Sequence, residues 1–162
     1  MSIKNLITHK EKVFILDSID TFFSLHLNVK QQSIILFGSV NKLSKNVLVY
    51  ICSKHTRECN ELYLRCGNFE DSALIDIKQI IIARISFIQK FQRCGKGVLL
   101  LMKICEIARK FNYEVICFEA PNEDCQAFAS RLGFDKENWS IDRERLITNL
   151  QKYLKNKLKK SD

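Results

Sequence analysis

The most constraining feature of the chain is the alternation of apolar segments in its second half. Residues 79–88 form a run rich in isoleucine, and residues 98–111 repeat apolar side chains at helical spacing. A second apolar run covers 115–120, and a second helical pattern follows it to residue 132, with Asn122 as the candidate N-cap. Strands that alternate with helices in this way pair in parallel through right-handed crossovers. The sequence therefore predicts an α/β arrangement here, with residues 79–88 in a strand covered on both faces.

The first part of the chain has two different periods. Residues 10–27 carry apolar side chains at three- and four-residue steps, which predicts a helix, and the polar stretch 17–20 suggests a division into two helices. The expected buried stripe is Val13, Leu16, Ile19, Phe22, Phe23 and Leu27. Residues 33–40, 47–53 and 61–66 are short β-branched and aromatic runs between turn residues, which predict an antiparallel meander.

These patterns together define the expected fold. It is an α/β protein of the α+β type, with a mixed central sheet, an antiparallel N-terminal meander, a parallel pair of strands and flanking helices. The 162 residues fit one domain, 1–162.

The last segment is a basic amphipathic helix over residues 141–160. Its apolar stripe is Ile141, Leu146, Ile147, Leu150, Tyr153, Leu154 and Leu158. Residues 142–162 hold seven Lys or Arg and three Asp or Glu, so they carry half of the net charge of +8. A solvated helix is the simplest interpretation, while an acidic protein, nucleic acid or an anionic cofactor are candidate partners. The apolar stripe would cover the protein's own body or a homodimer interface.

Composition argues against several classes of protein. No apolar run reaches the roughly 18 residues of a membrane span, so no membrane partner is expected. The first residues do not resemble a signal peptide, and the seven cysteines include no Cys-x-x-Cys pair, which favours reduced thiols and a cytoplasmic location. Cys52, His55, Cys59 and Cys66 are zinc-ligand types, but their spacing matches no standard pattern, so we expect no metal site.

The chemistry-bearing segment is the loop between the run 79–88 and the helical pattern 98–111. Gly95 and Gly97 lie where a strand is expected to end and a helix to begin. Glycine permits close approach of a ligand to the backbone, and a helix N-terminus favours an anion. The loop lacks the Lys-Ser/Thr of a Walker A motif and the third glycine of the dinucleotide fingerprint. It is therefore a candidate anion cradle of another kind.

Two segments resemble the GNAT superfamily of N-acetyltransferases. Gln92-Arg93-Cys94-Gly95-Lys96-Gly97 is similar to the family's Gln/Arg-x-x-Gly-x-Gly/Ala motif, and 87–91 takes the place of its Val-x-Pro-x-Tyr. Residues 122–134 resemble its Asn-x-x-Ala-x-x-Leu-Tyr-x-Lys-Leu-Gly-Phe. The resemblance covers about 79–135, which would form the cofactor-binding core.

This resemblance implies acetyl-coenzyme A, held where two parallel strands splay apart. The backbone of Phe87, Ile88 and Gln89 would pair with the pantetheine arm. Gln92 would begin the segment that binds the cofactor, and the backbone N–H groups that would hold the pyrophosphate are those of Arg93, Cys94, Gly95, Lys96, Gly97 and Val98. Asn122 would bind the lower pantetheine or position the thioester, and Phe128 would pack beside the cofactor. The side chains of Arg93 and Lys96 would add positive charge or be ordinary loop cations.

Acetyl transfer needs a base, and the thiolate often leaves with a donated proton. Glu119 is the leading candidate base because it lies at the C-terminal end of the expected strand 115–120, beside the expected splay; it could instead be solvated or paired with Arg84. The family's proton-donating tyrosine corresponds to Ala129. Cys125, Ser130 or water could replace it, or the thiolate could leave unassisted.

The resemblance implies an N-acetyltransferase that acts by direct attack in a ternary complex. The amine acceptor is undecided among a protein, a small molecule and an aminoacyl-tRNA. The alternative is a catalytically silent module that binds acetyl-coenzyme A and contacts a partner through its basic helix.

Overall fold

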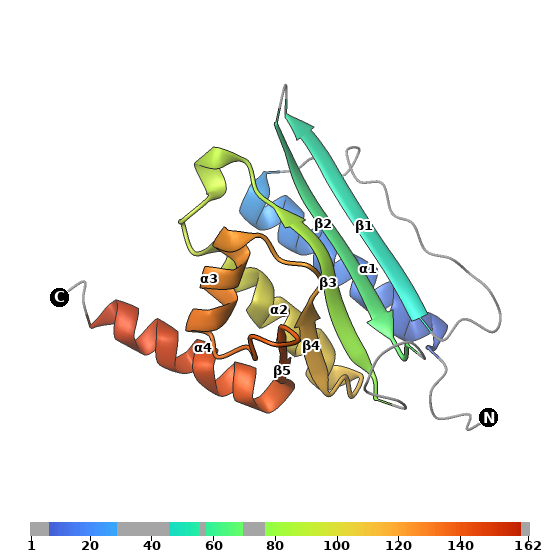
Figure 1. Cartoon of the computed structure of the whole chain (residues 1–162). Helices are drawn as coiled ribbons and strands as arrows, with labels where there is room; N and C mark the ends of the chain where they lie inside the picture. Colours follow the sequence, from blue (N-terminus) through green and yellow to red (C-terminus); the bar gives the residue numbers. More distant parts are fainter. Residues whose placement is uncertain (1–6, 29–45, 56–57, 70–76, 160–162) are drawn as a thin grey trace.

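A five-stranded mixed sheet forms the centre of the computed structural model, which describes residues 7–28, 46–55, 58–69 and 77–159 (Figure 1). In chain order the elements are α1 (His9–Leu27), β1 (Asn46–His55), β2 (Glu58–Gly67), β3 (Gln79–Ser86), the 3-10 turn η3 (Gln89–Phe91), α2 (Lys96–Lys110), β4 (Val115–Phe118), α3 (Glu123–Arg131), β5 (Ser140–Asp142) and α4 (Arg143–Leu158). The predicted strand 33–40 lies outside the described residues.

The pairing of the strands confirms a mixed α+β sheet. The strand order in space is β1-β2-β3-β4-β5, the same as along the chain. The β1–β2, β2–β3 and β4–β5 pairs are antiparallel, while β3 and β4 are parallel. The short strand β5 was not predicted, and it includes Ile141, which sequence reasoning assigned to the last helix.

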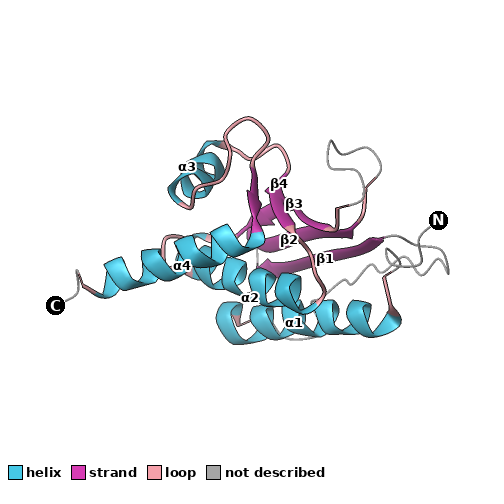
Figure 2. Ribbon diagram, turned by 90° about the horizontal axis from the view of Figure 1, so that it is seen from below, coloured by secondary structure: helices cyan, strands magenta, loops and turns pink. Residues whose placement is uncertain are grey.

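The helices lie on both sides of the sheet. Figure 2 shows α1, α2 and α4 on one side and α3 on the other. Alternate residues of the strands point toward α1 and α2, as the period of two requires. The core that they form with these helices is closed to solvent, and each of its central side chains is at most 2% exposed. These side chains are Ile15, Ile19, Phe22, Phe23, Leu62, Leu64, Ile80, Ile82, Leu100, Leu101 and Ile104.

Helix α1 is continuous, so the predicted division at residues 17–20 is wrong. Thr8 caps it by accepting a hydrogen bond from Glu11 N at 3.1 Å. Its buried face contains Ile15 and Ile19. Val13, which was expected in the buried stripe, lies outside this face and is 41% exposed. The short polar stretch falls within a helix whose apolar face continues before and after it, so packing overrides local polarity.

The carboxylate of Glu11 is buried beneath this helix. It accepts hydrogen bonds from Lys78 Nζ at 2.8 Å and from Tyr113 Oη at 2.6 Å. Lys78 Nζ also donates to the Phe111 carbonyl at 2.9 Å and lies 4.5 Å from the Tyr113 ring centroid. These contacts join α1 to the start of β3 and to the connection between α2 and β4.

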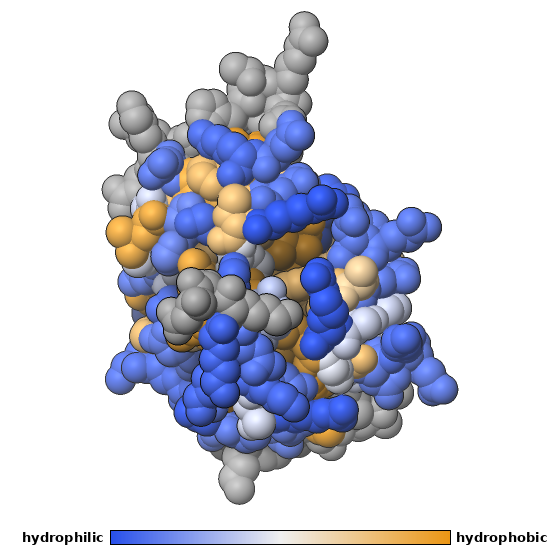
Figure 3. Space-filling view, turned by 90° about the vertical axis from the view of Figure 1, so that its left-hand side faces the viewer, coloured by the Kyte–Doolittle hydropathy of each residue, from blue (hydrophilic) through white to orange (hydrophobic). Residues whose placement is uncertain are grey.

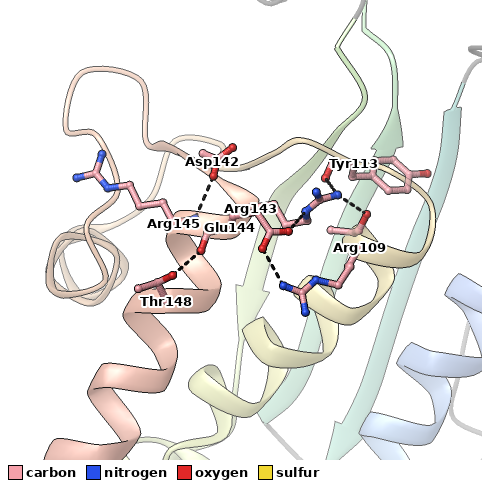
Figure 4. A network of polar contacts seen from close by, with 8 residues as sticks. Arg109, Tyr113, Asp142, Arg143, Glu144, Arg145 and Thr148 are labelled. Atoms are coloured by element: carbon pink, nitrogen blue, oxygen red, sulfur yellow. Dashed lines mark hydrogen bonds and ion pairs between the residues drawn. The ribbon is translucent and has the colours of Figure 1, made fainter.

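Helix α4 begins at an N-cap, Asp142, whose side chain accepts from Arg145 N at 3.0 Å. Figure 4 shows the neighbouring contacts, in which Arg143 Nη1 donates to the Tyr113 carbonyl at 3.2 Å and Arg109 pairs with Glu144 at 2.7 Å. These contacts fix the start of α4 against the end of α2. Within the described residues, no helix combines the length and apolar character needed to cross a membrane.

Candidate functional site

The parallel strands β3 and β4 part after a short pairing. Their last paired residues are Ile82 and Phe118, and Glu119 N then donates to Ile82 O at 3.0 Å. β3 continues to Ser86, whereas the segment after β4 turns away at Ala120, which has a φ of 42°. The β2–β3 register shifts at the same level, where Tyr63 opposes Arg84 and Leu64 opposes Ile82. Ala83 is therefore the extra residue of a β-bulge, which bends β3 as β4 leaves it.

The prediction that the strand 79–88 is covered on both faces is right only for its first half. The burial of β3 is high over Gln79–Ile82 but alternates beyond that point, and Arg84 and Ser86 are exposed. Coverage on both faces therefore holds only where β4 lies alongside.

Two side chains fix the backbone that enters this loop. Asn60, which is 1% exposed, accepts a hydrogen bond from Ile88 N at 2.9 Å. Gln92 Nε2 donates to the Phe87 carbonyl at 2.7 Å. Two of the backbone groups predicted to pair with pantetheine are thus bonded within the protein. Sequence reasoning missed Asn60, because its partner lies 28 residues away on another element.

The loop leads into α2 through a left-handed glycine. Gly95 is the N-cap, with a φ of 79° and no side-chain cap, and Arg93 has a φ of 56°. The Leu99 N–H donates to Gly95 O at 3.1 Å, so the N–H groups of Lys96, Gly97 and Val98 precede the hydrogen bonds of the helix. Such N–H groups attract anions.

Three cationic residues lie in or beside the cradle. Arg93 and Lys96 come from the loop and the start of α2. Lys157 comes from the far end of α4, and its Nζ lies 3.8 Å from where a Cβ on Gly95 would stand. Its place was not predicted, because it depends on how α4 crosses the molecule. Figure 3, which views the side where this part of the chain lies in Figure 1, shows a hollow with an apolar floor between hydrophilic side chains.

The second predicted motif lies against the first. A Cβ on Gly97 would come within 3.1 Å of the Phe128 ring of α3, so this ring occupies the space beside the glycine. Asn122 is the N-cap of α3 and accepts from Cys125 N at 2.9 Å, as predicted for a capping residue. The structure therefore brings Gly97 and Phe128 together and leaves Asn122 exposed at the helix start.

The position of the expected proton donor is closed. Ala129 is fully buried and offers no proton. Cys125, one turn earlier, is half-buried, and burial raises the pKa of its thiol to about 11. That thiol is protonated at neutral pH, so it can donate a proton but is a poor nucleophile.

Glu119 is paired, but with a different arginine from the one considered in the sequence. Its carboxylate forms an ion pair with Arg65 of β2. Arg84 Nη1 instead donates to Glu61 at 2.9 Å, and Glu61 also accepts from the Tyr50 hydroxyl at 2.8 Å. The register of β2 and β3 places Arg84 opposite Tyr63 and near Glu61. No local pattern marks Arg65, because 54 residues separate it from Glu119.

The part of the chain that the structure describes contains no cluster of three or more His, Cys, Asp or Glu side chains suited to a metal. The side chains of Cys52, His55 and Cys59 lie outside that part. Cys66 is fully buried, and burial raises the pKa of its thiol well above the usual range.

Comparisons with known proteins give a weak structural likeness. No family model matches the sequence, and no curated protein matches it. A chain from "The crystal structure of KacTA-DNA complex" aligns over 84% of this chain and 86% of its own length, with 19% identity and a TM-score of 0.43. A likeness at that level carries no argument about fold or function.

Proposed function

We propose that the protein is an acetyl-coenzyme A-dependent N-acetyltransferase of the GNAT type. The observation that carries the proposal is the glycine loop, which opens α2 beside the point where β3 and β4 part. Three cations, Arg93, Lys96 and Lys157, lie around or near it. This arrangement fits a ligand with a pyrophosphate at one end and an extended arm that enters the sheet. The cysteine content favours a cytoplasmic location.

The residues fit the anionic end of the cofactor better than its arm. The N–H groups of Lys96, Gly97 and Val98 would hold the pyrophosphate, aided by the charges of Arg93 and Lys157. Along the arm, the Phe87 carbonyl and the Ile88 N–H already have partners in the protein. Pantetheine would therefore pair with the remaining backbone groups of this segment or displace the Gln92 side chain.

Acetyl-coenzyme A supplies a thioester, whose C–S bond breaks as a C–N bond to the amine forms and coenzyme A is released as the thiol. Glu119 would accept the proton that the amine loses, once its carboxylate is free of Arg65. The protonated Cys125 thiol is one candidate on α3 to donate the proton to the leaving sulfur, with Ser130 or water as alternatives. In each transfer, Glu119 would gain the proton that the amine loses, and Cys125 would lose the proton that the coenzyme A sulfur gains.

The alternative function is a catalytically silent module that binds acetyl-coenzyme A. Two observations favour it: Ala129 is buried without a proton donor, and Glu119 is held in an ion pair. The lysines of α4 would then contact a protein or, less favoured, a nucleic acid, and a homodimer remains a further candidate assembly.

The test combines thermal unfolding with turnover. Acetyl-coenzyme A at one hundred times its Kd should stabilise the native protein by about 2.7 kcal/mol. Glu119→Gln should keep this stabilisation but lose about 100- to 10,000-fold in transfer to amines, because the base acts on the acceptor. Arg109→Gln, which breaks an exposed ion pair on α2, is the control and should retain both. Absence of stabilisation in the native protein refutes cofactor binding, and binding without any turnover favours the silent module.

A further inference from the structure

The sheet face opposite α1 and α2 carries two arginine–carboxylate pairs. Glu61 and Arg65 alternate along β2 with Leu62 and Leu64, which point into the core, so both charged side chains lie on the other face. Arg65 pairs with Glu119, and Arg84 pairs with Glu61. This face therefore presents the candidate base together with guanidinium groups.

The two pairs differ in exposure and in partners. The Glu61 side chain is only 13% exposed and also accepts from Tyr50 Oη, so this carboxylate is held in the sheet, although its partner Arg84 is 64% exposed. The Glu119 side chain is 49% exposed and that of Arg65 30%. Of the two carboxylates, Glu119 is therefore the one that a ligand can reach and displace from its arginine.

The guanidinium of Arg65 is only partly satisfied by the protein. Nη2 donates to Glu119, and Cζ lies 5.5 Å from the Phe69 ring centroid. Nε is buried and has no hydrogen-bond partner among the residues that the structure describes. A buried donor without an acceptor is rare in native proteins and often marks a ligand or a water site. The planar fork of an arginine matches a carboxylate or a phosphate through two parallel hydrogen bonds.

We propose that the amine acceptor carries an anionic group, a carboxylate or a phosphate, close to its amine, and that Arg65 binds this anion. The anion replaces Glu119 as the partner of Arg65, and the released Glu119 carboxylate takes the proton of the amine. This inference rests on the proposed function, since it assigns a role to the same site.

The exchange preserves the charge balance of the site. An acceptor with one ammonium and one anionic group brings a partner for each member of the Arg65–Glu119 pair. An amine without the anion leaves Arg65 bound to Glu119 and meets a base that is already occupied. The pair therefore acts as a selective element that favours one class of acceptor over its uncharged analogue.

The experiment compares matched acceptors that differ only in the anion. Phenylalanine is paired with phenethylamine, and O-phosphoethanolamine with ethanolamine, so the two pairs separate a carboxylate from a phosphate. With the native protein, at least one pair should show a kcat/KM about tenfold higher for the anionic member, as expected from one charge-assisted contact. Arg65→Gln should remove this preference, mainly through KM, and Arg65→Lys should restore part of it.

The controls separate this inference from the proposed function. Arg109→Gln loses a similar exposed ion pair on α2 and should keep the native preference. The Kd for acetyl-coenzyme A should stay within about twofold in every variant, because neither Arg65 nor Arg109 belongs to the loop that would hold the pyrophosphate. Equal kcat/KM values within both pairs for the native protein overturn the inference and leave the enzyme standing. If acetyl-coenzyme A binds but no amine is acetylated, the enzyme proposal fails and this inference fails with it. If acetyl-coenzyme A does not bind, cofactor binding itself is refuted.

Discussion

The buried carboxylate of Glu11 shows how single residues hold distant segments of this protein together. Its side chain is 4% exposed, that of Lys78 is 15% exposed, and the two atoms of the ion pair are 2.8 Å apart. Burial raises the pKa of the Tyr113 phenol above its usual range, and the neighbouring Cys66 and Glu11 raise it further. Tyr113 therefore remains a hydrogen-bond donor to Glu11 at all ordinary pH values.

We expect Lys78→Met to lower the free energy of unfolding by about 3–5 kcal/mol, because it leaves Glu11 as a buried charge without its cation. Urea denaturation of the native and variant proteins measures the change. Glu11→Leu/Lys78→Met removes both charges and should recover most of the loss. A single variant as stable as the native protein would show that water, rather than Lys78, solvates the carboxylate.

Short sequence patterns predicted some of the residues that shape the candidate site and the core, and missed others. Asn122 and Gly95 were found because capping and glycine-loop patterns are short and contiguous in sequence. Asn60, Arg65 and Glu11 were missed as a group, since each acts through a partner on another element. Arg84 was one partner that the sequence left open for Glu119, and it pairs with Glu61 instead, because strand register, which the sequence alone does not state, decides which arginine lies beside the carboxylate.

At the level of elements, long periodic segments were predicted well and short or context-dependent ones were not. The helical pattern at 98–111 corresponds to α2, and the parallel pairing of β3 with β4 is confirmed. β5 has three residues, too few for a periodic signal, and forms because β4 offers it an edge. The end of the terminal stripe was also overestimated, since Leu158 is 71% exposed beyond the last contact of α4 with the core.

The contact between α2 and α3 makes a specific demand on Gly97. A Cβ there would lie 3.1 Å from Phe128 Cζ, so a small shift of the ring admits alanine but not a branched side chain. Gly97→Ala also gains up to about 1 kcal/mol of helix propensity, which offsets that shift. We expect Gly97→Ala to be nearly neutral and Gly97→Val to cost about 1–3 kcal/mol by overpacking. Thermal unfolding measures both.

The route by which Gly97→Val affects the cofactor follows from the same geometry. The added side chain would push the Phe128 ring, so loss of acetyl-coenzyme A binding would come through a displaced α3. Phe128→Leu/Gly97→Val provides space for the branched side chain and should recover stability and part of the binding. If the double variant is as unstable as Gly97→Val, the ring is not what excludes the larger residue.

The whole molecule should lose stability in alkaline solution. Burial raises the pKa of Cys117 and Cys125 to about 11 and that of Cys105 to about 12, from 9.0, and it raises those of Cys66 and Tyr113 further. In the unfolded chain the same groups lose their protons near their ordinary values. The native state therefore holds more protons above pH 9, and its stability falls as pH rises.

Each cysteine contributes at most about 1.4 kcal/mol per pH unit to this slope between its unfolded and folded pKa values. Urea titrations at pH 8, 9 and 10 should show a steepening loss of stability. Cys117→Ala should make the fall of the unfolding free energy with pH less steep above pH 9, because it removes the contribution of one thiol. Equal stability at pH 8 and pH 10 would mean that these thiols are far less shielded from water than the structure indicates.

The strand order has a consequence for synthesis on the ribosome. Because the described strands follow one another in space as they do in sequence, each strand emerges after the neighbour it will join. β1, β2 and β3 can assemble as a meander while later codons are still being read. α1 is in a different position, since it packs against α2, which is made only after β3. During that interval the apolar face of α1 lacks its helical neighbour, which makes the nascent chain a substrate for chaperones until residue 110 has left the exit tunnel.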